Sequence, residues 1–208
     1  MRFPIKTSVV RIFQYTVIVL IIVQIFACKK GADDPFFSFH TRKARLSGSW
    51  NLKSAEWQKN DTSYIFNDSI LIISNAIKTD TLPMQHTITF NKDNSYTEEI
   101  NTDFPSDWKG NGEPAYTLTE TYLGTWKFTG GGNVPAKSQL LLQVTQSSLV
   151  SSSSMSNVDA TEYTDQPNGF VYDIQKLSKP ELILSYNLVI TYPGSTYTDN
   201  GSLNFTKD

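Results

Sequence analysis

The sequence is short of cysteine and histidine, since its 208 residues include one cysteine and two histidines. A single cysteine excludes an internal disulfide, so the fold must be stabilised by its hydrophobic core. The histidines, His40 and His86, lie far apart, and neither belongs to a metal-ligand spacing such as His-Glu-x-x-His. Gly110, Gly112 and the run Gly130–Gly132 have the spacing of turn glycines and form no phosphate-binding loop. We therefore predict no metal, no cofactor and no catalytic activity.

Positive charge is also scarce. The chain has 18 Lys and Arg against 20 Asp and Glu, and three of the basic residues, Arg2, Lys6 and Arg11, lie in the first eleven positions. Without them the remainder of the chain has 15 basic residues and a net charge of about −5. Because no basic stripe is left to neutralise phosphates, we expect no nucleic-acid partner.

The N-terminal segment has the order of an export signal, with basic residues followed by an apolar run from Ile12 to Ala27. This run is shorter than the roughly 20 apolar residues that cross a bilayer as a helix, so a permanent membrane span is the second interpretation. The segment Ile25-Phe26-Ala27-Cys28 resembles the bacterial lipobox, in which the cysteine is lipidated and becomes the first residue after cleavage. We expect a lipoprotein signal peptide at residues 1–27 and lipid attachment at Cys28.

Residues 28–45 have the composition of a tether, which would connect the lipid to a folded domain. Phe36, Phe37 and Phe39 are unusual in a spacer, and we expect them to pack on the domain or at the lipid interface. Asp33 and Asp34 resemble the acidic tag of surface-exposed Bacteroidetes lipoproteins. The predicted location is therefore the outer membrane, with the cell surface favoured over the periplasmic face.

From residue 46 onward, apolar residues alternate with polar ones, which is typical of half-buried strands. No stretch after Cys28 has helical periodicity. Asp199-Asn200-Gly201 has the composition of a tight turn before the last strand. The expected strands lie near Ser49 to Trp57, Ile70 to Ser74, Thr87 to Phe90, Ser95 to Ile100, Tyr116 to Phe128, Leu140 to Val144, Phe170 to Ile174, Leu182 to Tyr192 and Ser202 to Phe205.

Two Gly-x-Trp motifs, Gly48-Ser49-Trp50 and Gly124-Thr125-Trp126, open or lie within predicted strands. Together with the strand pattern they resemble the lipocalin-like lipoproteins of Bacteroidetes. The resemblance implies that residues 46–208 form one antiparallel, all-β barrel of about eight to ten strands, with Trp50 at its floor and Trp126 in its core. A β-sandwich is the alternative.

Tyr116, Glu120 and Tyr122 share the mainly apolar face of one strand and are the candidate ligand-pocket residues. An inward carboxylate such as Glu120 is either paired or in contact with a ligand. Glu98 and Glu99 are adjacent on a strand and point to opposite faces, so they cannot act on one bond, and we interpret both as solvated charges.

These features favour a non-catalytic, lipid-anchored module of the cell envelope that binds a small apolar ligand. Its partner would be the membrane, through the lipid on Cys28. The alternative is a structural or protein-interaction component of a surface assembly, with a filled barrel and working loops at 103–114 and 147–168. An enzyme is the third hypothesis, and it lacks residues that would carry a reaction.

Overall fold

The computed structural model describes residues 41–108, 110, 112–130, 137–152, 158–162, 169–192 and 195–208, the side chains of 158–162 and 192 excepted. The predicted signal peptide 1–27, Cys28 and the tether up to residue 40 lie outside the described residues. Within the described part, no helix is long and apolar enough to span a membrane.

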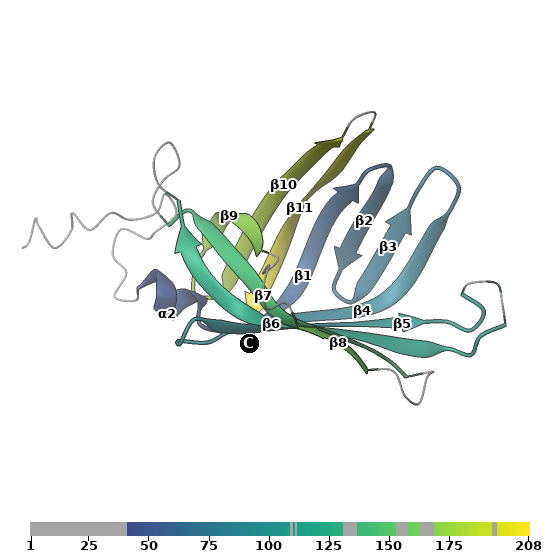
Figure 1. The fold of residues 1–208 in the computed structure, drawn as a ribbon, viewed down its shortest axis with the longest axis horizontal. Coiled ribbons are helices and arrows are strands. Elements are labelled where there is room, and N and C mark those ends of the chain that lie inside the picture. Colours follow the sequence, from purple (N-terminus) through teal and green to yellow (C-terminus); the bar gives the residue numbers. More distant parts are fainter. Residues whose placement is uncertain are drawn as a thin grey trace, which may run out of the picture.

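The described residues form one short helix and one antiparallel sheet that closes into a barrel (Figure 1). The predicted all-β antiparallel barrel is therefore confirmed. Ten strands form the closed ring. Strand β8 pairs with the last part of β7 and is not one of these ten. The elements are α2 (Arg42–Leu46), β1 (Gly48–Lys59), β2 (Thr62–Asn67), β3 (Ile70–Ser74), β4 (Thr79–Phe90), β5 (Ser95–Phe104), β6 (Tyr116–Thr129), β7 (Gln139–Ser151), β8 (Val158–Glu162), β9 (Gly169–Leu177), β10 (Glu181–Tyr192) and β11 (Ser195–Lys207).

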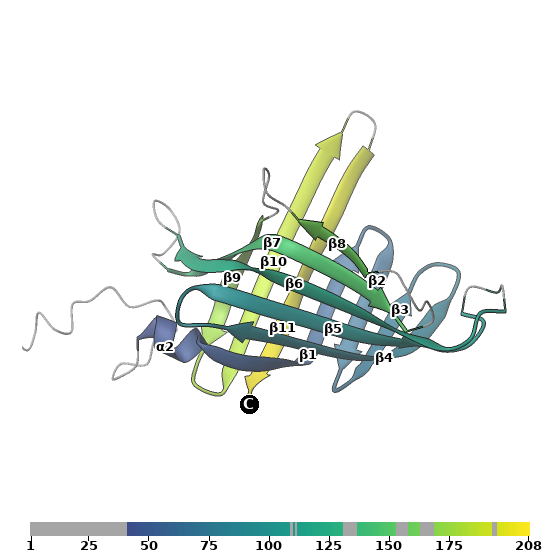
Figure 2. The ribbon, with the colours of Figure 1, turned by 60° about the horizontal axis from the view of Figure 1, so that its bottom comes forward.

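The barrel is wider at one end than at the other. At the narrow end the first residues of β1 pair directly with the last residues of β4, from Gly48 with Phe90 to Asn51 with Thr87. Farther along, β1 pairs with β2 and β4 pairs with β3, so the β2–β3 hairpin lies between them. The end that contains the β1–β2 and β3–β4 turns is called the wide end below. Figure 2 shows the wall of β5, β6 and β7 crossing in front of β10 and β11.

The core lies at the narrow end, which α2 closes. Leu46 and Trp50 are fully buried there, and the indole Nε1 of Trp50 donates a hydrogen bond to the Leu46 carbonyl at 2.7 Å. The Lys207 ammonium lies 4.9 Å from the centre of the Trp50 ring and donates to the Arg45 carbonyl. Arg45 in turn donates to the Leu177 carbonyl at 3.3 Å. Residues 42–45, which were predicted to end the tether, form most of α2 and pack against the barrel.

The last predicted turn is wrong, because Asp199, Asn200 and Gly201 lie inside β11. Gly201 pairs with Trp57, and a Cβ on Gly201 would lie 2.5 Å from the Cβ of Trp57. The glycine is needed for this close approach between strands, rather than for a turn. Strands β2 and β8 were not predicted.

Gly124 is a second glycine required by close packing, at an irregularity in the pairing of β6 with β7. A Cβ there would lie 2.1 Å from the Gln143 carbonyl oxygen and 2.6 Å from the Tyr96 ring. We expect Gly124→Ala to lower the free energy of unfolding by about 1–3 kcal/mol, because the backbone must shift. Urea unfolding of the full chain measures the loss. Gly169→Ala is the control, since its Cβ would meet a Leu141 methyl at 3.3 Å and the Leu142 carbonyl oxygen at 3.6 Å, and neither contact requires the backbone to shift. Equal losses in both variants would contradict the prediction.

Candidate functional site

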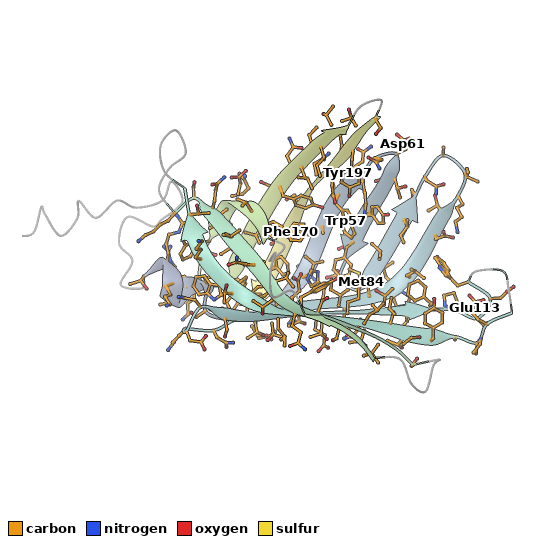
Figure 3. All side chains as sticks on the ribbon, viewed as in Figure 1. Trp57, Asp61, Met84, Glu113, Phe170 and Tyr197 are labelled. Atoms are coloured by element: carbon orange, nitrogen blue, oxygen red, sulfur yellow. The ribbon has the colours of Figure 1, made fainter. Side chains whose placement is uncertain are left out.

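A cavity of about 480 Å³ lies inside the barrel, between the narrow-end core and the wide end. In Figure 3, Trp57 of β1, Met84 of β4 and Phe170 of β9 mark three sides of it. A second hollow of about 320 Å³ shares Glu98, Phe170 and Tyr172 with it, so the two adjoin. The apolar side chains around the larger cavity include Leu52, Trp57, Leu71, Ile73, Leu82, Met84, Ile100, Phe104, Phe170 and Leu203.

Strand alternation determines which side chains reach this cavity. On β5, Glu98, Ile100 and Thr102 line the cavity, whereas the neighbouring Glu99 is exposed. The register pairs Ile100 with Glu120, which places Glu120 of β6 on the same inner face. The alternation therefore places two carboxylates, those of Glu98 and Glu120, on the inner face of β5 and β6.

Aromatic rings form much of the cavity wall. The rings of Trp57 and Tyr64 are stacked, with centroids 5.0 Å apart and an interplanar angle of 3°. Tyr172 meets Tyr186 edge to face at 5.7 Å. Such packed aromatic pairs hold each other's rings in place.

Three carboxylates line the cavity, and each accepts a hydrogen bond within it. Glu98 Oε1 lies 2.7 Å from His86 Nε2. The Tyr122 hydroxyl donates to Glu120 at 2.7 Å. Asp199 accepts from the hydroxyls of Tyr186 at 2.9 Å and Tyr197 at 3.2 Å.

Three tyrosines around the cavity have raised pKa values. Burial raises the pKa of Tyr172 well above its usual value, and the negative charge of Glu98 raises it further. Burial also raises the pKa of Tyr96 and of Tyr186, and the hydrogen bond that Tyr186 gives to Asp199 adds to the second shift. These three tyrosines are therefore neutral at physiological pH, and Tyr186 donates its hydroxyl proton to Asp199.

The structure separates the three predicted pocket residues. Glu120 lines the larger cavity, and Tyr122 lines the adjoining hollow and holds the Glu120 carboxylate. Tyr116 lies near the wide end, stacked on Phe104 at 4.9 Å, and is not among the lining residues. Trp50 and Trp126 are 0% and 3% exposed, at the narrow end of the barrel.

The interpretation of Glu98 as a solvated strand charge is wrong. Its side chain is 19% exposed, lines the cavity and contacts His86, which was also not predicted to take part. The sequence held a usable signal, because Glu98 alternates in step with Tyr96 and Ile100. Asp199 was missed because residues 199–201 were assigned to a turn.

No group of three or more His, Cys, Asp or Glu side chains among the described residues has an arrangement that could hold a metal ion. The three carboxylates of the cavity instead form separate hydrogen-bonded groups: Glu98 with His86, Glu120 with Tyr122, and Asp199 with two tyrosines. Comparisons with family models, curated proteins and solved structures gave no match for this chain.

Proposed function

We propose that this protein is a lipid-anchored module of the cell envelope whose barrel binds a small, largely apolar molecule without transforming it. The observation that carries the proposal is the cavity of about 480 Å³. Small-molecule sites in proteins are concave, mostly apolar, and about 300–1,000 Å³ in volume, with a few polar groups that fix orientation. The cavity has this size and this composition.

The shape of the barrel supports a carrier over a filled, purely structural barrel. A barrel of about eight strands has an interior just wide enough for side chains or one small ligand. Here the β2–β3 hairpin adds two strands at the wide end, where the cavity lies, while Leu46 and Trp50 fill the narrow end. Side chains thus fill the narrow end of the barrel, and the cavity lies between this packed end and the wide end.

The predicted lipid on Cys28 supports the same function. An anchored barrel would stay beside the membrane, where apolar molecules are concentrated, and the resemblance of the Gly-x-Trp motifs to lipocalin-like lipoproteins agrees with this. We place the protein at the outer membrane, with the cell surface favoured by the acidic residues that follow the cysteine.

A neutral probe tests the binding function. We expect the full chain in lipid nanodiscs to bind 2-(1-naphthyl)ethanol at one saturable site, measured by calorimetry against empty nanodiscs. Ile100→Trp should weaken binding about tenfold or more, because the larger side chain fills the cavity. The control is Glu99→Trp, on the outer face of the same strand, which should bind like the unchanged protein. Absence of saturable binding, or equal loss in both variants, would contradict the proposal.

A further inference from the structure

The negative charges of the cavity lie on opposite walls. Glu98 and Glu120 come from the neighbouring strands β5 and β6. Asp199 comes from β11, which is five places from β5 in the order of strands around the ring. A molecule in the cavity would therefore have carboxylates on two sides.

The cavity lining does not supply matching positive charge. Among the described residues that line the two hollows, none is Lys or Arg. His86 neutralises Glu98 only while its imidazole is protonated. Glu120 is held by a neutral phenol, that of Tyr122. Among the described residues, the Glu120 carboxylate thus has a neutral hydrogen-bond donor and no ion pair with a cation.

Among the three cavity carboxylates, Asp199 has a lysine opposite it on the neighbouring strand. Its register partner on β1 is Lys59, which is exposed and directs its ammonium over the Tyr197 ring, 5.9 Å from the ring centre. Near the wide end, Lys78 lies over Trp108 in the same way, at 5.1 Å. Aromatic rings in this part of the barrel therefore already accept cations on their faces.

Charge and ring faces together discriminate between kinds of apolar ligand. An apolar anion, such as a fatty acid, would bring a carboxylate beside three others and would be repelled. A protonated amine would gain charge-assisted hydrogen bonds from the carboxylates and cation–π contact with the rings. The apolar walls would hold the rest of such a molecule.

We infer that the ligand is an organic cation, with an apolar body in the aromatic part of the cavity and a protonated amine at Glu120 and Glu98. This inference rests on the proposed binding function and names the ligand class of the same site. Glu120 is the principal partner of the amine. Glu98 and Asp199 add to the negative electrostatic potential of the cavity.

Matched probes test the charge preference. The full chain in nanodiscs is titrated at neutral pH with 2-(1-naphthyl)ethylamine, 2-(1-naphthyl)ethanol and 1-naphthylacetate, and empty nanodiscs provide the background. We expect the amine to bind about tenfold or more tighter than the alcohol, and the carboxylate to bind weakest. Equal affinity for amine and alcohol would overturn the inference and leave the proposed function standing. No saturable binding of any probe would overturn the proposed function itself.

Isosteric substitutions show which carboxylate causes the preference for the amine over the alcohol. Glu120→Gln should weaken amine binding about tenfold while alcohol binding stays within about twofold. Glu98→Gln should reduce the same preference, whereas Glu99→Gln, on the outer face of the same strand, should leave it unchanged. An amine preference that survives in Glu120→Gln and in Glu98→Gln would place the cation elsewhere and overturn the assignment.

Discussion

Replacing Trp50 with alanine is expected to lower the free energy of unfolding by about 3–5 kcal/mol. The Trp50 side chain is fully buried, its Nε1 bonds the Leu46 carbonyl, and its ring lies under the Lys207 ammonium. The substitution removes all three interactions and leaves a cavity under α2. A loss of this size is a large part of the 5–15 kcal/mol that stabilises a typical domain.

Urea unfolding of the full chain measures this loss. The control is Phe170→Ala, which removes an aromatic side chain that is 51% exposed, and we expect it to cost about 1 kcal/mol or less. The loss of unfolding free energy in Trp50→Phe should lie between those of the other two variants, because phenylalanine keeps a large buried ring. Trp50→Ala and Phe170→Ala variants of equal stability would show that the narrow end does not hold the fold together.

Replacing Cys28 with alanine is expected to prevent lipid attachment and to block cleavage before residue 28, so that the variant keeps residues 1–27. Cys28 is the only cysteine in the chain, so no second thiol can carry the lipid. One acyl chain gives only marginal membrane binding, whereas two or more anchor a protein stably. The mature protein should therefore be held at the membrane by its acyl chains, whereas the variant should carry no acyl mass and should keep residues 1–27 instead.

Membrane fractionation and intact mass of the mature protein check this prediction. The unchanged protein should begin at Cys28 and carry the mass of its acyl chains. Lys29→Ala, next to the modified residue, is the control and should be processed and anchored as before. A Cys28→Ala variant that is cleaved and fractionates as before would contradict lipidation. An unchanged protein that keeps residues 1–27 and carries no acyl mass would favour a permanent membrane span.

Most of the barrel could be predicted from alternation, because one face of each strand is buried and the other is solvated. In β6, Leu118, Glu120, Tyr122 and Trp126 fall on one face, and the pairing with β5 confirms that this face is the inner one. Strand β2 was missed because it is short and has Ile65 on its outer face, 43% exposed, between inward Tyr64 and Phe66. Three consecutive apolar residues do not show which face is buried.

The candidate site could be predicted only in part. Glu120 stood out because its strand face is strongly apolar, and Glu98 could have been found in the same way. The role of Asp199 depends on contacts between distant parts of the chain, because Gly201 keeps β11 extended by making room for Trp57. Strand spacing alone does not reveal that the β2–β3 hairpin widens the barrel, since this depends on which strands pair.

We propose that the hollow part of the barrel carries a small apolar molecule. Native mass spectrometry of the full chain, isolated from its own membrane and followed by solvent extraction, tests this most directly. We predict one bound small molecule for each protein chain, with an apolar body and an amine, and its loss from Ile100→Trp. A compact chain that carries no small molecule in its native membrane would contradict the claim.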